Sequence, residues 1–91
     1  MQNDVMTIVT PAGEMVGRIK DENDNTVTLE SPRAFIQTQE GMGFAPGVCM
    51  TGEQNPKEMT FNKSQVILMC KSSDQVSKAW IQQTSGLVLS T

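Results

Sequence analysis

Side chains that could carry out catalysis are scarce in this chain. It contains no histidine, the usual general base and a common metal ligand. Ser72 and Ser73 follow Lys71 and could be imagined as a nucleophile and its base, but no glycine-rich oxyanion loop accompanies them. Two serines ahead of an apolar stripe are typical of a helix cap. We therefore expect a protein that is not an enzyme and that carries no cofactor.

Acidic and glycine-rich segments do not indicate a metal or phosphate site either. Asp21, Glu22 and Asp24 lie close together, yet the glycine and the distant glutamate of a calcium loop are missing. The glycines at positions 41 and 43 are not followed by Lys-Ser/Thr or by a helical pattern, as a phosphate loop requires. We expect a solvated acidic turn at the first place, no phosphate loop at the second, and no bound metal.

Two polar turns remain as candidates for binding: Asn23-Asp24-Asn25 and Asn62-Lys63-Ser64. Amide side chains both donate and accept hydrogen bonds, so they suit the base edges of single-stranded RNA, and Lys63 adds a positive charge. Asn, Asp and Ser are also common in turns for backbone reasons alone, and a lysine there is usually solvated. The binding interpretation and the purely structural one both stay open.

The first turn lies in the middle of a predicted β-hairpin. Residues Met15 to Lys20 alternate between two faces, and Thr26 to Leu29 alternate again. Between them stand five consecutive Asp, Glu or Asn residues, for which a turn costs least. Upstream, Val5 to Thr10 is rich in β-branched residues and is predicted to be a strand that ends at Pro11.

Downstream of the hairpin, Ser31-Pro32 predicts a bend or bulge, and an edge position for the strand that continues through Ala34-Phe35-Ile36. Residues 37–56 contain four glycines and two prolines, and we interpret them as a long excursion. Within it, Gly43-Phe44-Ala45 and Val48-Cys49-Met50 could form a small inserted hairpin.

The last third of the chain predicts two strands and a helix. Met59 to Phe61 is a short strand, and Val66 to Cys70 is a continuous apolar run that we expect to be covered on both faces. A helix over about 73–85 follows, with Gly86 as its end and an apolar stripe that includes Val76 and Trp80. Trp80 either docks this helix onto the sheet or is exposed to hold a protein partner. Residues 87–91 could add an end strand or fray.

Size and charge limit what the protein can be. Its 91 residues form one domain, with three Phe, one Trp and no Tyr to fill the core, so we expect self-association to cover apolar surface. A net charge of −3 does not provide the basic field of non-specific nucleic-acid binding. With no membrane-spanning apolar run and no signal-peptide pattern, we expect a soluble cytoplasmic protein. Cys49 and Cys70 are expected to be buried free thiols, with a single disulfide as the alternative.

Five short strands, an Asn/Asp-rich turn after the second and a tight polar turn before the last predict an all-β fold. It would be a small, strongly bent antiparallel barrel with a long inserted hairpin or loop and a short C-terminal helix.

Met6 to Leu29 resembles the first signature of the Sm/LSm proteins, which include the bacterial Hfq branch: Gly17 lies two residues before the apolar Ile19, and Asn23 stands where the family usually carries Asp. Met59 to Met69 resembles the second signature, a strand, a short basic turn and an apolar closing strand. The chain departs from the family pattern in several places. Gly13 and Gly17 are one residue closer together than in the usual signature, and no residue clearly corresponds to the Asn that contacts a base. Asn62-Lys63 stands where the second signature has Arg-Gly.

The resemblance implies a homo-oligomeric ring in which the last two strands of neighbouring copies pair. The residues that this pairing would place at the interface are Met59, Phe61, Val66, Ile67, Leu68 and Met69. The resemblance also brings the two polar turns together at a central pore, where Asn23, Asp24, Asn25, Asn62, Lys63 and Ser64 would bind single-stranded RNA. The alternative is a small β-barrel interaction or assembly module with no nucleic-acid role.

Overall fold

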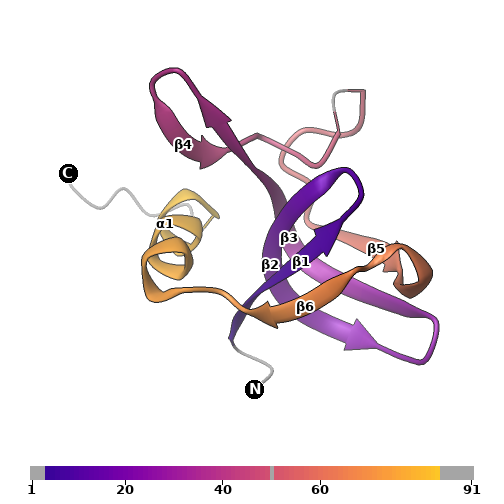
Figure 1. Ribbon diagram of the computed structural model, residues 1–91. Coiled ribbons are helices and arrows are strands. Elements are labelled where there is room, and N and C mark those ends of the chain that lie inside the picture. The colour runs from indigo at the N-terminus through magenta and orange to yellow at the C-terminus, as the bar shows by residue number, and fades with distance from the viewer. Residues whose placement is uncertain (1–3, 50, 85–91) are drawn as a thin grey trace.

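The computed structural model of the chain describes residues 4–49 and 51–84, which form strands followed by a C-terminal helix (Figure 1). The strands, the 3-10 turn η1 and the helix are β1 Val5–Thr10, β2 Gly13–Glu22, β3 Thr26–Thr38, β4 Gly41–Phe44, β5 Glu58–Asn62, η1 Lys63–Gln65, β6 Leu68–Lys71 and α1 Asp74–Thr84. Figure 1 shows η1 and α1 at opposite ends of β6. No helix among the described residues is long and apolar enough to span a bilayer.

All six strands belong to one antiparallel sheet in the order β4-β3-β2-β1-β6, with β5 also paired to β3. Strand β3 is long enough to take two partners in turn on the same side. Its first half, Thr26–Glu30, pairs with β5, and its second half, Phe35–Thr38, pairs with β4. The mostly β architecture with a short C-terminal helix is therefore as predicted.

The central hairpin is confirmed. Asn23 begins the turn between β2 and β3: its side-chain Oδ1 accepts hydrogen bonds from the backbone N–H groups of Asn25 and Thr26, at 2.8 and 2.9 Å. The backbone N–H of Asn23 donates to the carbonyl of Thr26 at 3.0 Å. The turn is thus fixed by a single asparagine whose short side chain replaces backbone partners.

The bend predicted at Pro32 is also present. The register between β2 and β3 shifts between the Val16 and Arg18 pairs, and Ser31 has a φ of 49°. Gly17 lies opposite this bulge, where a Cβ would come within 2.8 Å of the carbonyl oxygen of Glu30. The predicted edge position is wrong, because β3 has neighbours on both sides. Pro32 is tolerated because it lies where β3 changes partner, so no ladder bond is required of it.

The predicted excursion over 37–56 is partly regular. Strand β3 continues to Thr38 and forms a hairpin with β4, so the inserted hairpin pairs 35–38 with 41–44 and not 43–45 with 48–50. In Figure 1 this hairpin stands away from the other strands. The irregular part that follows returns to β3 through hydrogen bonds between Ala34 N and Gly47 O and between Ala45 N and Ala34 O, at 3.0 and 2.8 Å.

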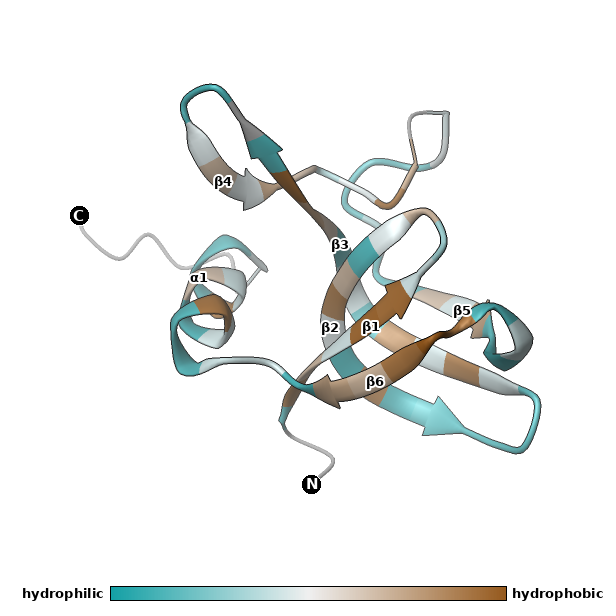
Figure 2. Cartoon of the chain, in the orientation of Figure 1, coloured by the Kyte–Doolittle hydropathy of each residue, from teal (hydrophilic) through white to brown (hydrophobic). Residues whose placement is uncertain are grey.

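Two hydrophobic clusters lie on the two faces of the sheet. The inner cluster is built on Ile8, Met15, Val27 and Leu29. The outer cluster is built on Val5, Val16 and Trp80, with Phe35, Phe44 and Val76 packed against it. Figure 2 shows hydrophobic residues along β1 and β6 and hydrophilic residues at the β2–β3 turn. Alternation along β2 therefore sends Met15 into one cluster and Val16 into the other.

Helix α1 covers the outer cluster. Ser73 is confirmed as its cap, since Ser73 Oγ accepts a hydrogen bond from the N–H of Val76 at 3.3 Å. Trp80 is only 3% exposed and donates from Nε1 to the carbonyl of Ser31 at 2.9 Å. Trp80 therefore docks the helix, and the alternative of an exposed Trp is wrong. The predicted helix end at Gly86 and the segment 87–91 lie outside the described residues.

Candidate functional site

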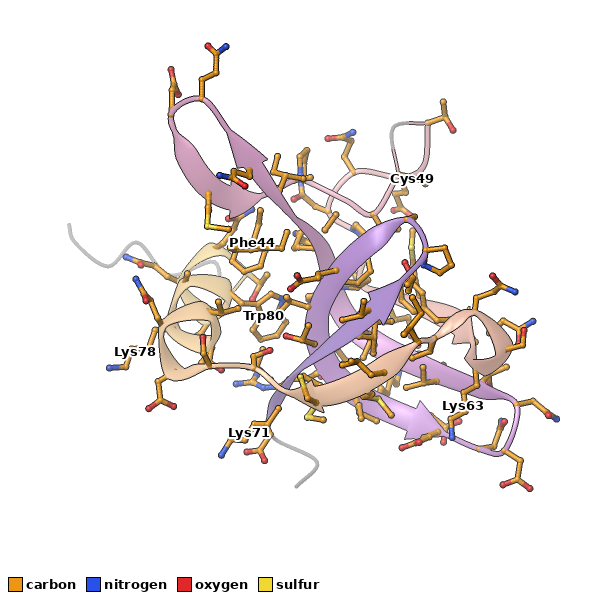
Figure 3. All side chains as sticks on the ribbon, viewed as in Figure 1. Phe44, Cys49, Lys63, Lys71, Lys78 and Trp80 are labelled. Atoms are coloured by element: carbon orange, nitrogen blue, oxygen red, sulfur yellow. The ribbon has the colours of Figure 1, made fainter. Side chains whose placement is uncertain are left out.

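The two polar turns predicted to bind RNA lie side by side. Strand β5 pairs with β3 so that Asn62 is opposite Thr26, next to the end of the β2–β3 turn. The backbone N–H of Lys63 then donates to the carbonyl of Asn25 at 2.9 Å. Figure 3 shows Lys63 beside the tip of the β2–β3 hairpin. Residues almost forty positions apart are thus joined at one end of the sheet, which the sequence suggested only through the family resemblance.

The asparagines in these turns already serve the backbone with their oxygens. Asn23 Oδ1 holds its own turn, as described above, and Asn62 Oδ1 accepts from Ser64 N at 3.2 Å and from Ser64 Oγ at 3.1 Å. Asn62 is therefore the cap of η1. These bonds involve only the Oδ1 atoms. The Nδ2 group of each amide can therefore still donate a hydrogen bond to an acceptor such as a base carbonyl or ring nitrogen.

Lys63 does not act as an isolated positive charge. Its Nζ lies 2.7 Å from Oε2 of Glu22, and both side chains are partly exposed. A surface pair of this kind contributes only about 0–1 kcal/mol to stability, but it offsets the charge that a phosphate would meet. Sequence reasoning placed Glu22 in an acidic turn and missed this pairing. No local sequence pattern indicates the Glu22–Lys63 pair, because only the pairing register of β3 with β5 brings η1 to the end of β2.

The six residues predicted for the subunit interface fall into two groups. Phe61, Val66 and Met69 pack against the inner cluster, and Met59 is half-buried on β5. Ile67 and Leu68 are instead 66% and 49% exposed. The apolar run from Val66 to Cys70 is therefore not covered on both faces within one copy, and the regular strand occupies only Leu68–Lys71 of this region.

Strands β5 and β6 are the terminal strands of the path through β3, β2 and β1. In the described part of the chain, β5 pairs only with β3, and β6 pairs only with β1. Each therefore has one edge whose backbone N–H and C=O groups take no strand partner. An open edge that also carries exposed apolar side chains is a surface on which another strand can add.

The cysteines do not extend this site. Both Cys49 and Cys70 are free, as expected, but both are exposed, so the prediction of buried thiols is wrong. Cys70 lies on β6, where the strand's outer side faces solvent, and Cys49 lies in the irregular segment after β4. Among residues 4–49 and 51–84, no group of three or more Cys, Asp or Glu side chains is arranged to hold a metal ion.

A second polar contact strengthens the same hairpin farther from its tip. Lys20 Nζ donates to Oε2 of Glu58 at 2.9 Å, which joins β2 to β5 across β3. The hydrogen bond to the Glu58 carboxylate, and then its charge, raise the pKa of Lys20 above its usual value. This pair lies outside the two polar turns, in which Lys63 is the cation.

Neither a protein-family model nor a curated protein matches this chain. What the joined turns and the open strand edges can do therefore has to be argued from their own geometry and chemistry.

Proposed function

We propose that this chain is the subunit of an Sm-like homo-oligomeric ring that binds single-stranded RNA without catalysing a reaction. The observation that carries the proposal is the pair of exposed apolar residues Ile67 and Leu68 where β6 begins, beside the unpaired edge of that strand. In the ring, β5 of one copy pairs with β6 of the next. Pairing removes both open edges and covers the exposed side chains.

The packing of the strands supports a small, strongly bent barrel, open between β5 and β6, as the unit that assembles. The inner cluster collects side chains from the first three strands, from Phe61 on β5 and from Val66 and Met69 at the other end of the strand path. The 3-10 turn η1 connects those two ends directly. A sheet whose terminal strands share one core and one short connection is curled, and the resemblance of Met6–Leu29 and Met59–Met69 to the Sm signatures agrees with this order.

The RNA-binding part of the proposal is supported by the joined turns. Each subunit would present the Nδ2 groups of Asn23 and Asn62, and the Lys63 ammonium, at one end of the barrel. A ring repeats this set once per copy, so weak contacts with bases and phosphates add along one strand of RNA. Because Glu22 pairs with Lys63, an RNA phosphate has to compete with that carboxylate.

The Glu22–Lys63 pair also favours a second candidate, an assembly module with no nucleic-acid role. The chain is acidic overall, and the charge on the predicted pore lysine is already matched within the subunit. The first candidate requires the ring and RNA binding, and the second requires neither.

Assembly is tested by light scattering coupled to size-exclusion chromatography. We expect the parent protein to be an oligomer of about five to eight copies, as the family resemblance suggests. Ile67→Asp should give folded monomers, because a charge on an exposed side chain is tolerated in one copy but unpaired at a closed interface. Ile81→Asp is the matched control: Ile81 is also exposed, but it lies on α1 and should leave the mass unchanged. A monomeric parent protein would refute the ring.

RNA binding is tested by fluorescence anisotropy with short A-rich and U-rich RNA over a range of salt concentrations. Lys63→Ala should weaken binding of both RNAs and flatten the salt dependence, whereas Lys78→Ala should change little. Figure 3 shows Lys78 pointing away from the sheet, so this control removes the same charge elsewhere. Glu22→Gln should strengthen binding, because it frees Lys63. An oligomer that binds neither RNA at low salt would favour the assembly module.

A further inference from the structure

A hollow of about 450 Å³ lies between the β1–β2 turn, β3 and the irregular segment that follows β4. Figure 3 shows Cys49 of that segment beside the β1–β2 turn. The residues that line the hollow are Ala12, Met15, Ala34, Ile36, Gln54 and the segment 45–49. Neither polar turn and neither β5 nor β6 contributes to the lining, so the hollow is separate from the surfaces discussed above.

Backbone hydrogen bonds fix the walls of the hollow. The segment after β4 is held to β3 by the two bonds of Ala34 described above, and it is closed on itself by a bond from Asn55 N–H to the Pro46 carbonyl at 2.5 Å. At the β1–β2 turn, the N–H of Ala12 donates to Oγ1 of Thr10 at 3.2 Å. The hollow is therefore formed without a ligand, as small-molecule sites usually are.

The lining is apolar and uncharged. No acidic or basic side chain lines the hollow, although 19% of the residues in the chain are charged. The hollow is continuous with the inner cluster, because Met15 belongs to that cluster and Ala34 and Val48 pack against it. The carbonyls of Pro46 and Gly47 already accept backbone hydrogen bonds. An ordered water needs about two to four polar partners, so water is held weakly here and an apolar molecule can displace it.

The side chains of the lining favour an aromatic ligand. Met15 and Cys49 both carry sulfur, which makes favourable contacts with aromatic rings, and no lining residue is itself aromatic. Gln54 supplies the one amide side chain of the lining, which can accept a hydrogen bond from a ligand donor. A charged group would stay unpaired against these walls. An apolar cavity of about 150 Å³ holds one benzene ring, so this hollow has room for two fused rings.

We propose that this hollow binds a small, uncharged aromatic molecule of one or two rings that carries a hydrogen-bond donor. The ring lies against Ala34 and Ile36 of β3, between the sulfur-containing side chains of Met15 and Cys49, and its donor faces Gln54. Binding covers Ile36, which is otherwise 41% exposed, and shields the exposed thiol of Cys49.

The two free cysteines make this proposal measurable with an internal reference. Both thiols are exposed, but Cys49 lines the hollow and Cys70 lies on β6. The full chain is titrated with indole, which has two fused rings and one N–H donor, and alkylation of each thiol by iodoacetamide is followed by mass spectrometry. We expect a saturable loss of reactivity at Cys49 and an unchanged rate at Cys70.

Two analogues of indole test the chemistry of the ligand. Indole-3-acetate adds a carboxylate to the same rings, and cyclohexanol keeps a hydrogen-bond donor but has no aromatic ring. We expect indole to protect Cys49 at a lower concentration than either analogue. Equal protection by cyclohexanol would overturn the aromatic assignment, and better protection by indole-3-acetate would overturn the assignment of an uncharged ligand.

A matched pair of alanine variants locates the binding site. Ala12→Leu places extra side-chain atoms in the hollow and should raise the indole concentration for half-protection about ten-fold or more. Ala79→Leu makes the same change on α1, outside the hollow, and should leave that concentration within about two-fold. Both alanines are exposed, so both variants should fold.

The proposal fails if indole slows alkylation at neither cysteine or at both equally, or if the two alanine variants shift the half-protection concentration by the same factor. It does not depend on the proposed ring. Ile67→Asp, which is designed to give monomers, should keep the indole protection of Cys49, so a failed ring and a failed ligand site give different results.

Discussion

Replacement of Trp80 tests how much of the stability depends on docking α1. The indole fills the outer cluster at 3% exposure, donates a hydrogen bond to Ser31 and lies under the Arg18 guanidinium. Trp80→Ala removes all three contributions, and truncations of this kind cost about 3–5 kcal/mol. A domain of this size is stable by only about 5–15 kcal/mol in total, so this variant should lie near the limit of folding.

Trp80→Phe separates packing from the hydrogen bond. Most of the ring volume stays, but the donor to the Ser31 carbonyl is lost and the attraction to Arg18 is weaker. We expect a loss of about 1–2 kcal/mol, or a fall in Tm of roughly 4–16 °C for a chain of this length. The measurement is urea denaturation followed by far-ultraviolet circular dichroism, because the variants lack the fluorescent indole.

The test lies in the order of the unfolding free energies of the two variants. Trp80→Ala should be less stable than Trp80→Phe, and both should be less stable than the parent protein. If Trp80→Ala unfolds within about 0.5 kcal/mol of the parent, as surface substitutions do, the helix is not docked through this residue.

Three further predictions follow from single contacts. Gly17→Ala should destabilise by about 1–3 kcal/mol in urea denaturation, because its Cβ would meet the Glu30 carbonyl oxygen at 2.8 Å; unchanged stability would show that the bulge relaxes freely. Ser73→Ala should cost about 1 kcal/mol by removing the cap of α1, and Ser73→Asp should restore it. In an NMR titration, the pKa of Lys20 should fall toward its ordinary value in Glu58→Gln, and an unchanged pKa would contradict the pairing. Because the pKa of Lys20 is raised in the folded protein, the stability that this pair contributes is present below about pH 10 and is lost as the pH rises through the raised pKa.

Local sequence patterns were sufficient for β1, for the turn between β2 and β3, and for the helix. The strand Val5–Thr10 has the predicted bounds, the Asn/Asp turn joins β2 to β3, and Ser73 caps α1 where expected. Each of these depends on contacts between residues a few positions apart: side-chain alternation, a turn residue bonded to its own backbone, or a cap. Such contacts form with the same geometry whatever surrounds them.

The positions of β3 and β4 could not be obtained in this way. Pro32 predicts an edge strand, yet β3 is flanked on both sides because its partner changes at the proline. Gly41 and Gly43 belong to β4, although their composition indicates a loop. In both cases the partner strand decides the outcome, because tertiary pairing outweighs the weak strand preference of individual residues.

The chain's sequence therefore determined the candidate turns, the capped helix and the apolar closing segment, all of which rest on local geometry and on hydrophobic periodicity. Tertiary structure alone decided that the two turns touch through Lys63 N–H and Asn25 C=O, that Glu22 matches the charge of Lys63, and that Ile67 stays exposed in a single copy. It also decided that four distant segments form one pocket around Trp80. The physical reason is that ion pairs, open edges and pockets depend on which strands become neighbours, and that is set by burial of the whole core.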